Sequence, residues 1–300
     1  DAKLRPTLTL EQAISQSQPG QMIRMIAGDY CIDKPLRFPC SGTSEQPIIV
    51  RGEPDAIINA NKHPDPSVSA RNPGRGGFAV FQLIDVAHIR IELFTIKRAW
   101  PSAVYIENSQ DLAFRDLDIT DGTYAFYANG ERTRGISISD CRWVQDPNIW
   151  RGIRWDEIHD GKDENGNVIK VEYRYLNGAF FGADDIIGDV EIIRNDNNCH
   201  KLFSQDGVRG GFWYYYGNIC WFDSRPGPEG DEYNGGAVLK LGKGGAVAQP
   251  DYVSVCLHNS FFLRQKYIKK GTTRGLINAR NAIEHADPNK LPEDLMPLDQ

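Results

Sequence analysis

Short apolar segments recur along this chain at a nearly constant spacing, and the repeat constrains the fold more than any other feature. Ile89, Leu112 and Ile136 hold the same place in three of the segments and lie 23 and 24 residues apart. The repeated segments are IRIELFTI (89–96), LAFRDLDI (112–119), ISISDCRW (136–143), VEIIRNDN (190–197), WYYYGNIC (213–220), VSVCLHNSFF (253–262) and GLINARNAI (275–283). A period in the low twenties, with short strands and no helix between them, is typical of a solenoid. We therefore expect an all-β protein built from stacked coils.

One position of the repeat changes from apolar to polar along the chain. In chain order it is occupied by Phe94, Leu117, Cys141, Asn195, Asn218, Asn259 and Asn281. Stacked asparagines at a corner can hydrogen-bond to the coils on either side, which satisfies backbone groups that a tight corner leaves unpaired. The sequence therefore predicts an asparagine ladder in the later coils. His258 adjoins this ladder and is predicted to be a buried side chain with its hydrogen bonds satisfied.

The segment GFWYYYGNICWF (211–222) is dense in aromatic residues, and a strand must send neighbouring side chains to opposite faces. Trp213 and Tyr215 align with apolar positions of the preceding coil, so they are predicted to face inward. The predicted outward residues are Phe212, Tyr214 and Tyr216. An outward aromatic row can be a platform for a polysaccharide chain, or an inserted loop can cover it as a satellite core. We expect a mixture of these two arrangements, in which at least one tyrosine lies in a binding groove.

The first coils carry motifs that resemble a known family. TLEQAISQSQPG (9–20) has a helical pattern with Thr9 or Thr7 as its N-cap, and SGTSEQPIIVRGEP (41–54) follows it. Together they resemble the start of right-handed parallel β-helix polysaccharide enzymes, which have a capping helix, a PGD-I-L--G-Y strand pair and GT---PI-I. Gln21 stands where those enzymes have Asp. The resemblance is nearest to the alginate lyase and chondroitinase B group of the pectate-lyase-like superfamily. It implies a right-handed parallel β-helix with an N-terminal capping helix.

The chain is expected to be a single parallel β-helix domain over residues 1–300, with its capping helix at 9–18. Two pairs of successive ladder positions are farther apart in the sequence than whole coils require. Cys141 and Asn195 are separated by 54 residues, where two coils need about 46, and Asn218 and Asn259 by 41, where one coil needs about 23. The excess predicts loop insertions within 144–187 and 222–250. Insertions in solenoids cluster on the binding face, so these loops mark the expected site.

Composition excludes some partners. The chain has 34 Lys and Arg against 40 Asp and Glu, a net charge of −6, which argues against a nucleic-acid binder. No apolar run has the length needed to span a membrane, so no membrane partner is expected. We expect a secreted or periplasmic protein, whose mature form would begin as this chain does, with DAKLRPTLTL.

The six cysteines lie too far apart for a zinc site of the CxxC type. Cys31 and Cys40 flank a short loop and could form a disulfide in an oxidising compartment. The other four, predicted to be buried free thiols, are Cys141, Cys199, Cys220 and Cys256.

The first insertion combines arginines with aromatic residues. An arginine presents a planar fork of donors that matches a carboxylate or a sulfate, and flat aromatic side chains can stack on sugar rings. The same composition also suits a solvated loop that is held by its own salt bridges, although the interleaved aromatics favour binding. The candidate residues in this insertion are Arg151, Arg154, Trp155, His159, Tyr173 and Arg174.

Further candidates lie in the later coils. Lyases of the group that the chain resembles use a basic side chain to take the proton beside an activated carboxylate, with a second basic group about one coil later. Lys201 is the match for the first, and Lys240 for the second, where the family typically has arginine. His200 and Arg209 lie on the same coil as Lys201. No clear match to the family's calcium-binding Asn and Glu set is present.

Chemistry assigns roles to these candidates. Removing a carbon-bound proton beside a uronate requires that the carboxylate be neutralised, by Ca²⁺ or by Arg and Asn donors. The base needs a pKa near the working pH, which histidine has natively and which tyrosine or lysine acquires beside positive charge. The predicted catalytic residues are Lys201, His200, His159, Tyr173, Arg154 and Arg174. The predicted substrate-binding residues are Arg151, Trp155, Arg209, Tyr214, Tyr216 and Lys240.

The function predicted from the sequence is that of a lyase, which cleaves an acidic, uronate-containing polysaccharide by β-elimination, with Ca²⁺ as an optional cofactor. Two alternatives stay open. A glycoside hydrolase on the same fold would use an acidic pair, formed by Asp184 or Asp185 with Asp156 or Glu157. Gly-Asp-Asp is also ordinary turn chemistry, which is the favoured interpretation of that segment. A non-catalytic carbohydrate-binding solenoid would need only the aromatic groove.

Overall fold

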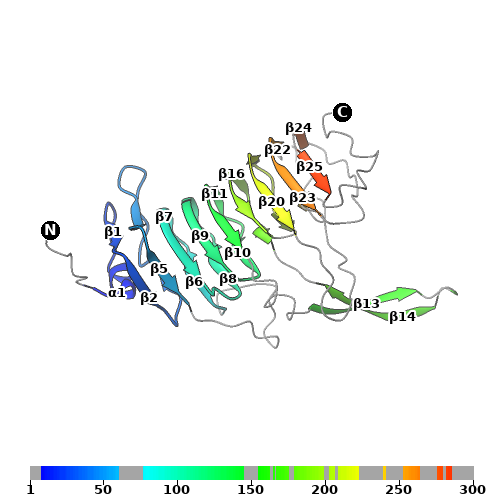
Figure 1. Cartoon of the computed structure of the whole chain (residues 1–300), viewed down its shortest axis with the longest axis horizontal. Coiled ribbons are helices and arrows are strands. Elements are labelled where there is room, and N and C mark those ends of the chain that lie inside the picture. Colours follow the sequence, from blue (N-terminus) through cyan, green and yellow to red (C-terminus); the bar gives the residue numbers. More distant parts are fainter. Residues whose placement is uncertain are drawn as a thin grey trace.

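The structure is a computed structural model, and Figure 1 shows the whole chain. It describes residues 8–60, 77–144, 155–162, 165, 167–175, 179–198, 203–206, 209–222, 239–240, 253–263, 276–279 and 282–285.

Nearly all of the described strands belong to a parallel β-helix with three faces, in which each strand pairs with its counterpart one coil earlier and one coil later. The first face consists of β1 (Met22–Met25), β4 (Ile48–Gly52), the first half of β7 (Ala87–Lys97), the first half of β9 (Gln110–Thr120), β11 (Arg134–Ser139), β16 (Gly188–Ile193), β19 (Phe212–Tyr216), β22 (Val253–Leu257) and β24 (Leu276–Ala279).

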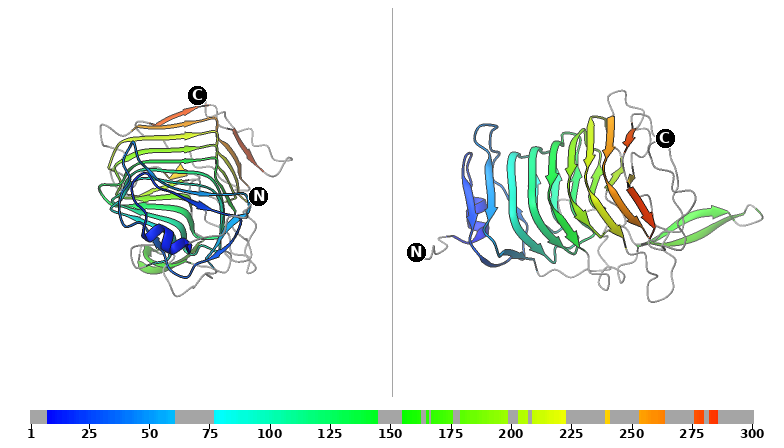
Figure 2. Two further views of the ribbon diagram at one scale, coloured as in Figure 1. Left: turned by 90° about the vertical axis from the view of Figure 1, so that its left-hand side faces the viewer. Right: turned by 45° about the horizontal axis from the view of Figure 1, so that its top comes forward.

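The second face consists of β2 (Gly28–Cys31), β5 (Ala56–Asn59), the second halves of β7 and β9, β12 (Arg142–Val144), β17 (Asp196–Asn197), β20 (Ile219–Phe222), β23 (Ser260–Leu263) and β25 (Ala282–His285). The third face consists of β3 (Leu36–Arg37), β6 (Ala79–Ile84), β8 (Ser102–Glu107), β10 (Tyr124–Asn129), β15 (Ala179–Asp184), β18 (Phe203–Asp206) and β21 (Leu239–Lys240). Figure 2 shows the strands stacked in register along the axis of the coil.

Inward side chains from the three faces fill one continuous core. Leu112 pairs with Ile89 on one side and with Ile136 on the other, and all three are buried, as the repeat predicts. In β19, Trp213 pairs with Val190 of β16 and Tyr215 pairs with Ile192, and both aromatic side chains are fully buried. The predicted inward half of the aromatic segment is therefore confirmed.

From β7 to β23, six successive coils turn from the first to the second face at a corner of two successive residues. The first residue has a positive φ, between 51° and 69°, and we call these residues the corner column: Leu93, Asp116, Asp140, Arg194, Gly217 and His258. The second residue is buried and occupies the predicted ladder position: Phe94, Leu117, Cys141, Asn195, Asn218 and Asn259. Asn281 lies outside the described residues.

The asparagine ladder forms as predicted. The Oδ1 atoms of Asn195, Asn218 and Asn259 accept the backbone N–H of the ladder residue one coil earlier, at 2.9, 3.0 and 3.0 Å. The Nδ2 of Asn195 also donates to Oδ1 of Asn218, at 3.0 Å, and that of Asn218 donates to Asn259, at 2.8 Å. Each Nδ2 further donates to a main-chain carbonyl of the preceding coil, on Ile138, Ile192 and Tyr215. Buried amides thus satisfy the polar groups of three successive corners.

A helix lies at the N-terminal end of the coil, where the sequence predicts one. It spans Leu10–Ser15 (α1), which is shorter than the expected 9–18. Thr9 is its N-cap: the Thr9 side chain accepts the N–H of Gln12, and the Gln12 side chain accepts the N–H of Thr9. Leu10 and Ile14 are buried in the core.

The first predicted insertion leaves the coil at the edge between the second and third faces, because it lies between β12 and β15. The first is narrower than the expected 144–187, because Val144 still belongs to β12 and Ala179 begins β15. Within it, β13 (Trp155–Lys162) and β14 (Val168–Tyr175) form an antiparallel hairpin that projects from the stacked strands (Figure 1). The second, expected at 222–250, contains the third-face strand β21.

No helix in the described part of the chain has the length and apolar character needed to cross a membrane.

Burial controls the chemistry of the cysteines. Cys31 is exposed and Cys40 half-buried, and the structure holds them as free thiols rather than as a disulfide. Cys141, Cys220 and Cys256 are buried as predicted, whereas Cys199 lies outside the described residues. Burial raises the pKa of the Cys141 thiol to about 12 and likewise that of Cys256.

Because the thiolate is the reactive form, Cys141 and Cys256 are expected to resist alkylation by iodoacetamide in the native protein at neutral pH, whereas Cys31 is expected to react. Peptide mass spectrometry after brief labelling measures this, and labelling in denaturant is the control, in which all cysteines should react. Rapid native labelling of Cys141 would contradict the buried corner.

Candidate functional site

The outward half of β19 forms an exposed aromatic row, which consists of Phe212, Tyr214 and Tyr216. The Phe212 and Tyr214 ring centroids are 6.1 Å apart with planes 20° from parallel, and those of Tyr214 and Tyr216 are 5.9 Å apart and 16° from parallel. Alternate residues of a strand are about 6.6 Å apart, so the rings simply follow the backbone. Phe212 is 44% exposed, and the two tyrosines are half-buried. The predicted outward row is therefore present and open at its surface.

The row continues into the next coil. His258 lies at the first corner after β22, and its ring meets that of Tyr216 edge to face, with centroids 5.4 Å apart and planes at 69°. His258 is exposed, so the prediction that it is buried is wrong. Its neighbour Asn259 is the buried ladder residue, and the positive φ of His258 (56°) turns its side chain away from that ladder to the outside.

Aliphatic and acidic residues flank the row on the outer side of the first face. Tyr216 pairs with Ile193 of β16 and with Leu257 of β22, and Tyr214 pairs with Glu191 and Val255. Glu191 is exposed and the three aliphatic side chains are half-buried. The surface thus combines flat apolar rings with a hydrogen-bond acceptor, a combination that can bind the apolar faces and hydroxyl groups of a sugar chain.

A charged pair lies at the corner beside the row. Arg194 donates from Nε and Nη2 to the two carboxylate oxygens of Asp140, at 2.7 and 2.6 Å. This bond lowers the pKa of the Asp140 carboxyl below its ordinary value and raises the pKa of Arg194. Both groups are therefore charged at neutral pH, and the fork of Arg194 is fixed in direction.

The predicted site residues do not gather on one face. Tyr214 and Tyr216 lie on the first face, whereas Lys240 lies in β21 of the third face, in register with Ser204. Arg209 lies at the edge between the third and first faces. Its guanidinium donates to both oxygens of Asp185, at 2.7 and 3.1 Å, and to Glu131. The hydrogen bond to Asp185 raises the pKa of Arg209.

Four candidates of the first insertion lie in the hairpin. Trp155 pairs with Tyr175, Glu157 with Tyr173 and His159 with Val171. Arg174 pairs with Asp156. The hairpin thus carries Trp155, His159, Tyr173 and Arg174 on one two-stranded element. The remaining predicted residues, Arg151, Arg154, His200 and Lys201, lie outside the described residues.

The third face carries a tyrosine cluster that sequence reasoning missed. The rings of Tyr105 and Tyr127 are 6.4 Å apart and 10° from parallel, and Tyr124 meets Tyr127 edge to face. All three tyrosines are buried, and Tyr105 donates to Glu107 Oε2 at 2.6 Å. A Cβ at Gly182 would lie 2.8 Å from both Tyr124 and Tyr127, so the glycine makes room for the rings. Because it is buried, this cluster serves packing.

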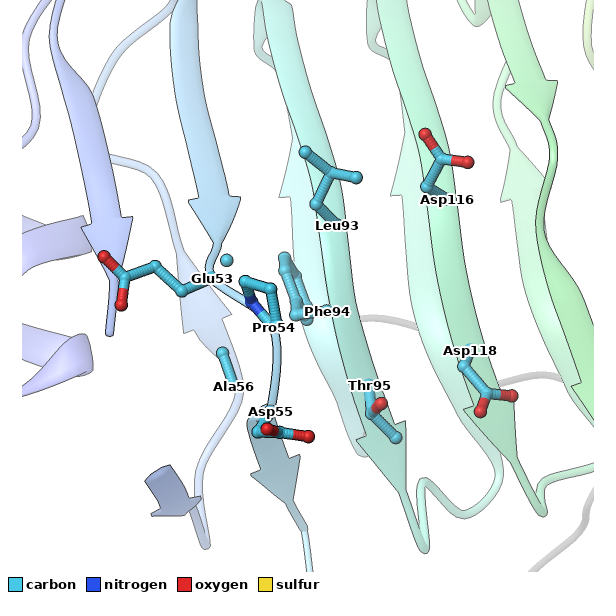
Figure 3. A pocket seen from close by; sticks show the side chains of 10 residues that line it. Glu53, Pro54, Asp55, Ala56, Leu93, Phe94, Thr95, Asp116 and Asp118 are labelled. Atoms are coloured by element: carbon cyan, nitrogen blue, oxygen red, sulfur yellow. The ribbon is translucent and has the colours of Figure 1, made fainter. Parts of the chain in front are cut away.

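An acidic hollow of about 420 Å³ lies along the same edge as the corner column, nearer the N-terminal end. Figure 3 shows Asp116 and Asp118 projecting from β9 beside Leu93 and Thr95 of β7. Arg115 pairs with Asp116 at 3.1 Å, and Arg142 with Asp118 at 3.5 Å. Its excess of carboxylates makes the hollow a poor site for an acidic polymer.

The described residues give calcium no evident site. Among them, no three Asp, Glu, His or Cys side chains converge in a way that could hold a metal ion. We therefore assign no calcium ligands and derive no step through a metal.

No protein-family model matches the sequence, and a search of curated proteins finds no match. Among solved structures, an alginate lyase from Paenibacillus sp. str. FPU-7 is 13% identical, with a TM-score of 0.37 over 91% of this chain and 96% of that one.

A mannuronic acid specific family 6 polysaccharide lyase from human gut microbiota is 16% identical, with a TM-score of 0.32 over 91% of this chain. This chain covers 49% of that one, about half its length. A GH136 lacto-N-biosidase from Eubacterium ramulus is 10% identical, with a TM-score of 0.29 over 92% of this chain and 64% of that one. The chain is thus distantly similar in structure to two polysaccharide lyases and a lacto-N-biosidase, and we transfer no residue role from them.

Proposed function

We propose that this protein is a polysaccharide lyase, which binds an acidic polysaccharide along the exposed aromatic row and cleaves it by β-elimination. The observation that carries the proposal is the row itself. It places three nearly parallel rings on a rigid sheet, one exposed and two half-buried, and their outer apolar surface is costly to leave in water unless a ligand covers it. Sugar rings have matching apolar faces. The uronate component and the elimination chemistry are what the resemblance of the first coils to the alginate lyase and chondroitinase B group implies, and the sequence supplies residue types that suit this chemistry.

The strands around the row support a preformed binding surface. β19 is held on both sides by parallel neighbours, and its inward residues Trp213 and Tyr215 are fully buried. The outward rings therefore have little freedom to lose when a ligand binds, which favours affinity. An extended polymer suits such a surface better than a small molecule, because the rings follow an open strand and not a closed pocket. A secreted or periplasmic location, which we also propose, would give access to such a polymer.

The hydrolase alternative has weaker support. Asp185 has a positive φ of 58°, the turn conformation that the sequence favours for this segment, and its carboxylate is already bound by Arg209. The cross-strand partner of Asp156 in the hairpin is Arg174. An acid and base pair for hydrolysis would need carboxyl groups that face one scissile bond.

The proposal is tested by incubating the purified protein with alginate, polygalacturonate and chondroitin sulfate. A lyase forms a carbon–carbon double bond conjugated to the carboxylate, so the ultraviolet absorbance of the mixture is expected to rise with at least one polymer. New reducing ends without a rise in absorbance would indicate a hydrolase. No product and no binding with all three would contradict the proposed function.

A further inference from the structure

We propose that the corner formed by Arg194, Gly217 and His258 is the reaction centre on this surface, where Arg194 binds the carboxylate of an acidic sugar and His258 is the catalytic base. This inference rests on the proposed function and deepens it. It places the chemistry at the end of the aromatic row, on side chains that the sequence analysis left without a role in catalysis.

The first argument is the glycine. Every other member of the corner column carries a side chain at the same positive φ: Leu93, Asp116, Asp140, Arg194 and His258. The backbone of the corner therefore does not require glycine, although Gly217 shares that conformation with a φ of 65°. A Cβ at Gly217 would meet only Cγ of Arg194, at 3.5 Å, which is an ordinary contact. The absence of a side chain thus leaves a gap on the surface, between Arg194 on one coil and His258 on the next but one.

The second argument is the direction of Arg194. Asp140 occupies Nε and Nη2 of its guanidinium from the N-terminal side, through two hydrogen bonds. The side chain is more than half exposed, and the structure gives Nη1 no protein partner among the residues it describes. Arg194 is thus a cation held in place beside the gap, with donor capacity left for a carboxylate. Asp140 acts as a positioning residue, because it fixes the fork without facing the gap.

The third argument is the placement of His258. Its backbone is fixed by the buried ladder residue that follows it, and its ring rests against Tyr216 at the end of the row. The imidazole is exposed, and imidazole is the side chain that exchanges protons most readily near neutral pH. Coils are stacked about 4.8 Å apart, so Arg194 and His258, two coils apart, are separated by about 10 Å along the axis at their backbones. One sugar ring fits across that distance.

The reaction balances with these groups. A sugar whose rings follow the aromatic row places a uronate over Gly217, with its carboxylate on Arg194. The imidazole of His258 takes the proton from C5, and the electron pair of that C–H bond forms the C4–C5 double bond. The bond from C4 to the glycosidic oxygen breaks, and the departing oxygen takes a proton from the imidazolium. The products are an unsaturated uronate and a new hydroxyl end, and His258 is neutral again.

The first test replaces His258 with asparagine, which tolerates a positive φ and keeps the corner folded. With whichever of the three polymers the wild-type protein cleaves, kcat is expected to fall at least 100-fold while the affinity for the polymer changes little. The matched control is His88→Asn. His88 has a φ of 55°, is half-buried and lies far from the row, so its replacement should leave both values unchanged.

The second test fills the gap. Gly217→Asn introduces a side chain at a φ that its neighbours in the corner column already tolerate, so the protein should fold while kcat/KM falls at least tenfold. Arg194→Gln should raise KM for the polymer, whereas Arg132→Gln, which breaks an exposed pair with Asp85 at a different edge, should not. Thermal melting of each variant confirms that the fold is kept.

The outcomes separate the inference from the proposed function. An active wild-type protein whose His258→Asn variant keeps kcat within threefold would overturn the inference and leave the lyase proposal standing. The same holds if Gly217→Asn folds and cleaves normally. A wild-type protein that neither binds nor cleaves any of the three polymers would overturn both.

Discussion

Asn218→Ala is expected to lower the free energy of unfolding by about 3–5 kcal/mol, because it leaves several buried polar groups without partners. In the native protein, the Asn218 Oδ1 accepts both the backbone N–H and the Nδ2 of Asn195, and its own Nδ2 donates to Ile192 and to Asn259. Alanine removes all four hydrogen bonds, and because the corner is fully buried, water cannot replace them. Urea unfolding followed by far-ultraviolet circular dichroism measures the change.

Asn167→Ala is the control for this experiment. Asn167 is exposed in the connection between the hairpin strands, so the same substitution there should change stability by no more than about 0.5 kcal/mol. If Asn218→Ala were as mild as the control, the ladder could not be a main support of the later coils.

The double variant Tyr214→Ala and Tyr216→Ala is expected to weaken polysaccharide binding by about 10- to 100-fold, since each ring contributes on the order of 1 kcal/mol of stacking. Both side chains are only half-buried and point away from the core, so the fold should survive their removal. Affinity electrophoresis in gels that contain alginate, polygalacturonate or chondroitin sulfate measures the mobility shift directly.

Ile219→Ala is the matched control for the loss of exposed apolar surface. Ile219 is 43% exposed but lies on the second face, so its truncation should leave the mobility shift unchanged. Tyr216→Phe should keep most of the affinity, because it keeps the ring. Equal binding by the double variant and the wild-type protein would exclude the row as the platform.

The fold was predictable because a solenoid repeats the same physical demand in each coil. The 23- and 24-residue spacing of Ile89, Leu112 and Ile136 set the register, and the structure pairs these residues with one another. The asparagine ladder followed from the same spacing, since only a residue at the inward corner position meets its counterpart. The alternation of a strand was enough to divide β19 into Trp213 and Tyr215 inside and Tyr214 and Tyr216 outside.

The site was less predictable, because side chains far apart in the sequence meet only through the path of the coil. Sequence reasoning grouped Tyr214 with Lys240, but the strands that carry them lie on different faces. It also placed His258 with the buried ladder, because His258 directly precedes the ladder residue Asn259 in the sequence. The sequence does not show that the positive φ of His258 turns its side chain outward. The signal that could have found Arg194 and His258 is their shared place in the repeat, one residue before the ladder.

The measurement that tests the lyase proposal most directly is mass spectrometry of the products formed in isotope-labelled water, from the acidic polysaccharide that the protein cleaves. Elimination adds no water, so the account predicts oligosaccharides with an unsaturated uronate at one end and no oxygen label in their new reducing ends. Labelled reducing ends, or the complete absence of oligosaccharides from alginate, polygalacturonate and chondroitin sulfate, would contradict it.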